Sequence, residues 1–292
     1  MLNGQITAAF GRHYEVTLPD GRIVNGIPRG KKSPYACGDR VELGPLHDSE
    51  AQILAHTPRT SLLYRSDQWK QKMIAANATQ IVLVVATEPG FSDALIARAL
   101  VAVQHEKMRA LIVLNKVDLT AGLNAARAQL APYATLGIPV IELCAHSDVS
   151  PLTALLTGHT SVFIGQSGMG KSTLTNALIP DAGAATREIS VALDSGKHTT
   201  THARLYPLPG GGALIDSPGL QEFGLAHLSR GEIELGFAEF VPHLGHCRFR
   251  DCKHENEPGC AIKAAVDSGQ IHPRRLEHFI TITTEGDRSR TF

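Results

Sequence analysis

The chain lacks a surplus of charge of either sign, and it lacks a long hydrophobic segment. Lys plus Arg and Asp plus Glu number 28 each among 292 residues, so net charge favours no partner of opposite sign. The longest apolar run, Ile81 to Ala86, is far shorter than the ~20 residues that span a bilayer. Residues 1–5 contain no apolar core of a secretory signal. We therefore expect a cytoplasmic protein without a membrane anchor, in which any contact with nucleic acid comes from local basic patches.

Cysteine is scarce as well. The chain has five, an odd number that argues against a full disulfide framework. Cys37 and Cys144 stand alone in the sequence, and we expect both to be small buried side chains. The other three lie within fourteen residues of one another, between positions 247 and 260, which indicates a shared role.

Three regions with different patterns follow one another, and we expect three domains with these boundaries. Residues 1–62 contain about five short β-type segments separated by turns, which predicts a small barrel of the OB type, with another small β-domain as the alternative. Residues 63–224 alternate strands and helices, as an α/β sheet does. Residues 225–292 are helical and rich in histidine. The fold class is therefore multidomain α/β.

The second region gives the clearest element pattern. Strands are expected at 80–86, 111–114, 139–142, 160–164, 203–208 and 213–216, and helices at 92–105, 121–134 and 171–179.

A phosphate-binding loop follows the strand at 160–164. Its sequence is Gly165-Gln166-Ser167-Gly168-Met169-Gly170-Lys171-Ser172, which matches the pattern G-x-x-x-x-G-K-S between a strand and a helix. Such a backbone wraps phosphates, and amides at the helix N-terminus point toward them. We expect Lys171 to contact the β- and γ-phosphates, Ser172 to ligate Mg²⁺ and Thr173 to lie near the α-phosphate.

A guanine-type loop, Asn115-Lys116-Val117-Asp118, follows the strand at 111–114. The Asp118 carboxylate can accept both the ring N–H and the exocyclic amine of guanine, and adenine would leave it unpaired. Asn115 would brace the loop and the stem of Lys116 would pack over the base. The alternative is that Asp118 only caps a helix. A further backbone contact to the base is expected from Ala145.

Asp216-Ser217-Pro218-Gly219 ends the strand at 213–216. Asp216 is placed to meet the Mg²⁺ shell, and Gly219 to offer an amide to the γ-phosphate as pivot of a second switch. The guanine-type loop thus comes first, the phosphate loop second and Asp216 last. Placing 160–216 before 80–157 restores the usual GTPase succession, so we predict a circularly permuted P-loop GTPase domain.

The first switch is expected in Gly196-Lys197-His198-Thr199-Thr200-Thr201, between the phosphate loop and Asp216. Thr200 or Thr201 would ligate Mg²⁺ when GTP orders the loop. The position after Gly219 often holds a glutamine that orients the attacking water, but here it is Leu220. His198 is the candidate substitute, with a plain surface role as the alternative. We expect slow intrinsic turnover that needs an activator.

The pattern Cys247-x4-Cys252-x-His254-x5-Cys260 predicts a structural zinc ion, because three thiolates and one imidazole close a tetrahedral site. A module this small buries little core, so the ion would supply much of its folding energy.

These motifs together resemble the RsgA (YjeQ) family of circularly permuted GTPases of small-ribosomal-subunit biogenesis. The resemblance covers nearly the whole chain and includes Gly38-Asp39-Arg40-Val41. It implies an N-terminal OB-fold, a permuted GTPase core and a C-terminal zinc domain. It also implies that the protein binds the small subunit late in assembly and that the subunit stimulates GTP hydrolysis. It assigns nucleotide contacts to 115–118 and 165–173; the Cys144-Ala145-His146 loop departs from the usual Ser-Ala.

We therefore expect an enzyme, a monomeric GTPase that grips rRNA with GTP bound and releases it after hydrolysis. Candidate RNA contacts are the basic residues Arg29, Lys31, Lys32, Arg248, Arg250, Arg274 and Arg275. One alternative is a nucleotide-gated RNA-binding factor with negligible hydrolysis. Another is a zinc protein with a vestigial phosphate loop, against which the complete motif set argues.

Overall fold

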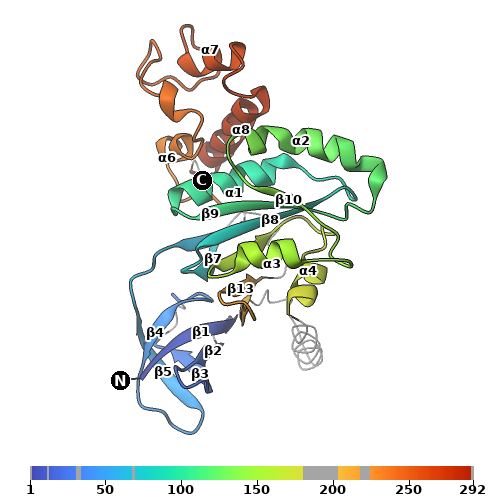
Figure 1. Cartoon of the computed structure of the whole chain (residues 1–292). Helices are drawn as coiled ribbons and strands as arrows, with labels where there is room; N and C mark the ends of the chain where they lie inside the picture. Colours follow the sequence, from blue (N-terminus) through green and yellow to red (C-terminus); the bar gives the residue numbers. More distant parts are fainter. Residues whose placement is uncertain are drawn as a thin grey trace.

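Figure 1 shows a computed structural model of the chain, which describes residues 2–11, 13–30, 34–67, 70–179, 203–217 and 224–290. The N-terminal barrel, a central sheet flanked by helices and a C-terminal group of helices follow one another from bottom to top in this view.

The N-terminal region is a closed five-stranded barrel, as the OB-type prediction required. Its strands are β1 (Leu2–Phe10), β2 (His13–Thr17), β3 (Ile23–Pro28), β4 (Arg40–Leu43) and β5 (Glu50–His56). They are ordered β1-β2-β3-β5-β4, and pairing of β1 with β4 closes the barrel. Alternate residues point inward and fill it, among them the fully buried Ile6, Val16 and Ile53.

A two-stranded hairpin, β6 (Leu62–Asp67) and β7 (Lys70–Ala76), lies between the barrel and the central sheet in sequence. The sequence analysis expected no separate element there, because its polar turn and mixed pattern give no clear period. The buried Leu63 and Ile74 nevertheless join the core of the central domain.

The central sheet consists of β8 (Gln80–Ala86), β9 (Arg109–Asn115), β10 (Val140–Glu142), β11 (Thr160–Ile164), β12 (Ala203–Pro207) and β13 (Ala213–Asp216). Its order is β10-β9-β8-β11-β13-β12, with only β12 antiparallel to its neighbour β13. Each strand matches an expected one to within a few residues. If the strands are renumbered along the unpermuted chain, with β11 as strand 1 and β8 as strand 4, the order from β12 to β10 reads 2-3-1-4-5-6. The sheet is therefore continuous although the chain is permuted.

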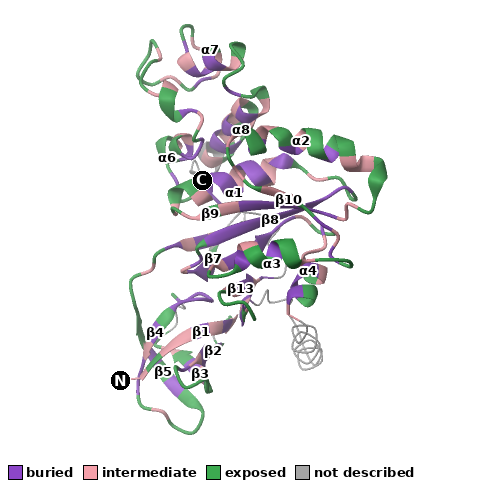
Figure 2. Cartoon of the chain, in the orientation of Figure 1, coloured by how far each residue is buried: buried purple, intermediate pink, exposed green. Residues whose placement is uncertain are grey.

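Helices cover both faces of this sheet, as a buried parallel sheet requires. They are α1 (Asp93–His105), α2 (Leu123–Thr135), α3 (Ser150–Leu156) and α4 (Lys171–Leu178), with a 3-10 turn at Thr120–Gly122. All seven residues of β8 are buried (Figure 2). Ile81, Leu83 and Val85 belong to the core beneath α1 and α2, whereas the alternate residues face α3 and α4.

Pairing of β1 with β12 joins the barrel and the central sheet into one eleven-stranded sheet. The sequence pattern predicts separate domains and gives no sign of this pairing.

The C-terminal region contains α6 (Arg230–Leu235), a 3-10 turn (Val241–His243), α7 (Ala261–Asp267) and α8 (Pro273–Arg290). The buried rings of Phe237, Phe240 and Phe279 pack together with centroids 5.0 to 5.6 Å apart. They belong to the same hydrophobic cluster as α1, so this region shares a core with the central domain. Among the residues that the structure describes, no helix is both long and apolar enough to cross a membrane.

Candidate functional site

The predicted nucleotide motifs meet at one edge of the central sheet. The phosphate loop follows β11, the guanine-type loop follows β9, and Asp216 ends β13. Since these strands are parallel and β8 lies between β9 and β11, their carboxyl ends lie together at one edge of the sheet, here called the nucleotide crevice. In open α/β sheets this edge is where ligands bind.

The phosphate loop depends on glycine for two close approaches. A Cβ at Gly165 would lie 2.2 Å from the Val84 carbonyl oxygen. A Cβ at Gly170 would lie 2.2 Å from Asn115 Nδ2, and Gly170 has φ 90°. No other residue fits either position without moving its neighbour. Met169 is buried in the core beneath the loop, so only its backbone faces the crevice.

Lys171 begins α4 and places its charge inside the loop. Its Nζ donates hydrogen bonds to the carbonyl oxygens of Gly165 at 2.6 Å and Gln166 at 2.9 Å. Burial lowers the pKa of Lys171, and the nearby Asp216 carboxylate opposes that shift. Burial likewise raises the pKa of Asp216, with the Lys171 charge acting in the opposite direction. The two charged groups thus interact in a partly buried environment, where electrostatic effects are stronger than in water.

Asn115 ties three loops together. Its Nδ2 donates to the Met169 carbonyl oxygen at 3.0 Å, and its Oδ1 accepts from the Ala145 amide at 3.1 Å. The side chain is almost fully buried. Asn115 therefore links the guanine-type loop to the phosphate loop and to the loop after β10.

The remaining residues of the guanine-type loop lie beside this link. Lys116 has φ 60°, and its Nζ donates to the Glu88 carbonyl oxygen at 2.8 Å. Thr87 Oγ1 donates to the Lys116 carbonyl oxygen at 3.2 Å. Asp118, three residues after Asn115, is exposed. The sequence analysis did not single out Thr87 or Glu88, since no motif marks them.

The other predicted nucleotide residues have varied positions. Ser172 is exposed and Thr173 half-buried on the first turn of α4. Gln166 accepts a hydrogen bond from the Ser92 amide at the start of α1, at 2.9 Å. His198, Thr200 and Gly219 lie outside the described residues, so the expected switch contacts have no geometry here.

The predicted metal ligands do come together. The ligand atoms of Cys247, Cys252, His254 and Cys260 all lie within 4.8 Å of one another. Cys247 Sγ lies 3.6 Å from His254 Nδ1 and 4.0 Å from Cys260 Sγ. A tetrahedral zinc ion separates such ligands by about 3.5 to 3.8 Å, given its usual bond lengths. The cluster therefore fits a metal ion of this kind.

Glu234 of α6 supports the cluster from outside. Its Oε1 lies 2.5 Å from His254 Nε2, so that nitrogen carries the proton and Nδ1 presents its lone pair to the thiols. The sequence analysis missed Glu234, because twenty residues separate it from His254.

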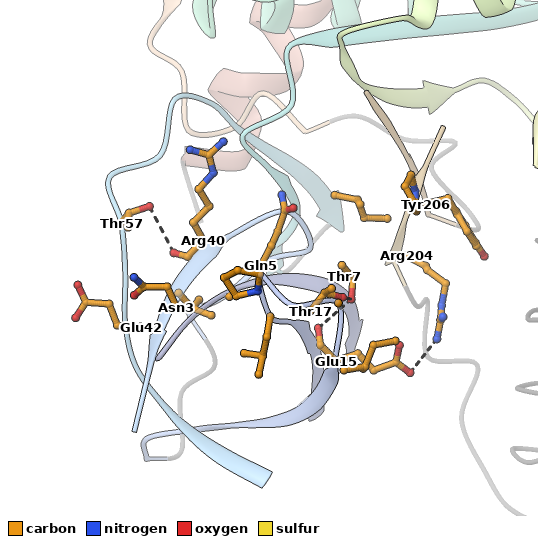
Figure 3. A pocket seen from close by; sticks show the side chains of 18 residues that line it. Asn3, Gln5, Thr7, Glu15, Thr17, Arg40, Glu42, Thr57, Arg204 and Tyr206 are labelled. Carbon is orange, nitrogen blue, oxygen red and sulfur yellow. Dashed lines mark hydrogen bonds and ion pairs between the residues drawn. The ribbon is translucent and has the colours of Figure 1, made fainter. Parts of the chain in front are cut away.

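A cavity of about 810 Å³ lies apart from the nucleotide crevice, where the barrel meets β12 (Figure 3). An ion pair between Arg204 and Glu15, 2.9 Å long, lies at its margin, and Arg40 lines another part. Two predicted RNA contacts, Arg274 and Arg275, form ion pairs within the protein, and Arg274 pairs with Asp93 at 2.7 Å. Arg275 is buried and paired with Glu239, so its prediction as a surface contact is wrong.

The fold and the crevice define a circularly permuted P-loop GTPase, because the motifs of that class meet in one site while their order along the chain is changed. The chain belongs to the RsgA GTPase family, whose family model matches residues 56–226. This confirms the resemblance, the fold class and the GTPase activity inferred from the sequence.

Curated relatives match along almost the whole chain. The small ribosomal subunit biogenesis GTPase RsgA of Burkholderia pseudomallei is 53% identical over 98% of this chain and 92% of its own length. The RsgA of Bordetella pertussis is 52% identical over 99% of this chain and 98% of its own length.

Two solved structures share the fold. YjeQ from Thermotoga maritima has a TM-score of 0.75 and 28% identity, covering 97% of this chain and 98% of its own. YloQ, described as a circularly permuted GTPase, has a TM-score of 0.72 and 26% identity, covering 99% of this chain and 96% of its own.

Proposed function

We propose that this protein is a cytoplasmic, monomeric GTPase that acts in late maturation of the small ribosomal subunit, binds its rRNA, and is stimulated by that subunit. Asn115 carries the proposal, because it joins the guanine-type loop to the phosphate loop in a chain that matches RsgA proteins end to end. GTP hydrolysis to GDP would drive release.

In the proposed GTP complex, one loop binds the guanine base and another binds the phosphates. The exposed Asp118 would accept the two N–H groups of guanine, which explains a preference over ATP. Backbone amides of 165–170 would hold the phosphates. Lys171, now bonded to two loop carbonyls, would exchange them for phosphate oxygens.

We assign Mg²⁺ to Ser172, Thr200 and the neighbourhood of Asp216. When bound, Mg²⁺ neutralises charge on the transferring phosphoryl group. Asp216 suits a cation because burial disfavours its charged form unless a positive partner is close. His198 is our candidate for orienting the attacking water.

We assign one structural zinc ion to Cys247, Cys252, His254 and Cys260, supported by the fit of their ligand atoms.

We also propose domains at 1–62, 63–224 and 225–292, with coupling between the second switch and the zinc domain. Gly224 donates to the Tyr64 carbonyl at 3.3 Å, and Leu225 and Leu228 pack into the core. The chain thus contacts the core eight residues after Asp216, so movement of Asp216 would be passed on.

GTP turnover, measured with the purified protein alone and with equimolar small ribosomal subunits, tests this function. We expect a low basal rate that rises steeply with small subunits and not with large subunits. Unstimulated turnover alongside tight GTP binding would favour the nucleotide-gated RNA-binding factor instead, and would remove the subunit as activator.

A further inference from the structure

A second group of metal-ligating side chains lies away from the zinc cluster. The ligand atoms of His105, Glu106 and His227 all lie within 4.8 Å of one another. His105 ends α1, Glu106 follows it, and His227 belongs to the segment that precedes α6. No sequence motif joins them, because more than a hundred residues separate the pair from His227.

The carboxylate of this group is held in place. Glu106 Oε2 accepts a hydrogen bond from the Leu62 amide at 2.9 Å, while Oε1 lies 3.9 Å from His105 Nε2. One oxygen is thus anchored and the other points toward the imidazole. Both residues sit at the C-terminal end of α1, where the partial negative charge of the helix favours a cation.

The second imidazole is also positioned by its surroundings. The His227 ring packs on Tyr64 of β6, with centroids 4.7 Å apart, and its centroid lies 6.0 Å from that of His105. The backbone on either side is fixed by Gly224, bonded to Tyr64, and by the buried Leu228. Glu232 at the start of α6 adds a second negative charge near both imidazoles.

We propose that His105, Glu106 and His227 form a second metal site, for a divalent transition-metal ion such as Zn²⁺ or Ni²⁺. Two imidazoles and a carboxylate are a ligand set that such ions prefer, with water completing the shell. Ligands of a tetrahedral ion lie about 3.4 Å apart, so the exposed imidazoles of His105 and His227 need only rotate to close the site. An ion there joins the end of α1 to the chain that leaves the second switch.

The test is calorimetric titration with Ni²⁺ of tag-free full-length protein that carries a single equivalent of zinc, which the cysteine cluster holds. We expect one equivalent of Ni²⁺ to bind. His227→Phe keeps an aromatic ring on Tyr64 but removes the ligand nitrogen, and Glu106→Gln keeps an acceptor for the Leu62 amide but removes the charge. Each should weaken Ni²⁺ binding about tenfold or more.

His47→Ala, which removes an exposed histidine of the barrel, is the matched control and should bind Ni²⁺ as the wild type does. Both test variants should retain the wild-type circular dichroism spectrum and zinc content. Absence of a Ni²⁺ equivalent in the folded wild type would overturn the proposal. So would binding that survives either His227→Phe or Glu106→Gln unchanged.

Discussion

At the scale of single residues, Asn115 has the largest structural role in the crevice. Its side-chain amide donates a hydrogen bond to the Met169 carbonyl oxygen and accepts one from the Ala145 amide. It also lies where a Cβ of any residue other than glycine at position 170 would clash with it. The geometry of the phosphate loop and of the guanine-type loop therefore depends on one buried group. Neither loop can shift without breaking one of these hydrogen bonds.

Asn115→Ala should lower GDP affinity by about ten- to hundredfold, because two buried hydrogen bonds worth about 1 kcal/mol each are lost and the loops are freed. Titration with a fluorescent GDP analogue measures the effect. Asn124→Ala on the exposed face of α2 is the control and should bind GDP normally. Equal affinities for the two variants would show that Asn115 does not organise the site.

Arginine residues show how little a residue type says by itself. Arg248 and Arg250 are exposed, as an RNA contact requires. Arg275 is buried, with Nε 2.5 Å from Glu239 Oε1 and its guanidinium 4.4 Å from the centre of the Phe237 ring. Arginine is thus available for phosphate contact where it is exposed and forms an ion pair in the core where it is buried, depending on its neighbours.

At the scale of elements, the docking of α8 onto α1 depends on Asp93. Its carboxylate accepts from Arg274 Nη1 at 2.7 Å and lies 3.2 Å from His278 Nε2. Burial alone would raise the pKa of Asp93, but His278 and Arg274 together outweigh it and lower the pKa. Since the folded pKa lies below the unfolded value of about 3.9, this carboxylate stabilises the fold above that pH.

Asp93→Asn should therefore destabilise the protein by about 2 kcal/mol at pH 7, because a charged hydrogen-bond acceptor of Arg274 is lost. The difference from the wild type should shrink as pH falls below about 4, because the carboxylate is protonated first in the unfolded chain and only at lower pH in the folded protein. Urea unfolding of both proteins from pH 7 to pH 3 measures this difference.

Asp20→Asn is the matched control for this experiment. Asp20 pairs with Arg22 at a similar distance, 2.8 Å, but both side chains are more than half exposed, so its loss should have little effect. A difference between Asp93→Asn and wild type that stays constant down to pH 3 would contradict the role of the Asp93 charge.

The C-terminal elements around α7 depend on the metal cluster. Cys260 is both a proposed metal ligand and the N-cap of α7, where its Sγ accepts from the Lys263 amide at 3.5 Å. Removing the ion leaves three thiols and an imidazole without the contact that holds the 247–260 segment together.

Chelation of the zinc should therefore speed amide hydrogen exchange in 244–267 and leave GDP affinity within about twofold of its starting value. Exchange mass spectrometry gives the first readout and a fluorescent nucleotide the second. Cys252→Ser should reproduce the change, whereas Cys144→Ser, outside the cluster, should not. Unchanged exchange in α7 after complete chelation would rule out a structural role for the metal.

At the scale of the whole molecule, the three regions are joined more closely than their patterns suggest. β1 pairs with β12, and the C-terminal helices share a hydrophobic cluster with α1. Deleting 225–292 would expose the apolar side of α1, including Ile96 and Val101. Coupling between the regions is therefore tested better by surface substitutions than by truncation.

The double variant Arg248→Ala/Arg250→Ala should reduce subunit-stimulated GTP turnover while basal turnover stays unchanged. Each lost phosphate contact should also reduce the salt dependence of subunit binding, by about 0.7 to 0.9 in log–log slope. Turnover with increasing subunit concentration, at several salt concentrations, measures both effects.

Arg127→Gln on α2 removes an exposed positive charge from another surface and serves as the control. An equal loss of stimulation in this control would mean that overall charge, rather than the zinc-domain surface, attracts the subunit.

Much of the fold and site could be predicted because the motifs are short and local. The phosphate loop, the guanine-type loop and the cysteine cluster each fit within fourteen residues, and the strands before them are apolar runs. The β6–β7 hairpin, the β1–β12 pairing and Glu234 could not be predicted, because each depends on contacts between segments far apart in the sequence.

The sequence by itself determined the nucleotide class, the cluster of three cysteines and one histidine, and the permuted order, since these follow from residue type and spacing. Only the tertiary structure decided that Asn115 joins three loops, that Arg275 is buried, and that His105 and Glu106 lie beside His227. The physical reason is that the spacing of residues in a short motif fixes which side chains lie close enough to bind one ligand. Which distant atoms meet depends on how strands pair and helices pack.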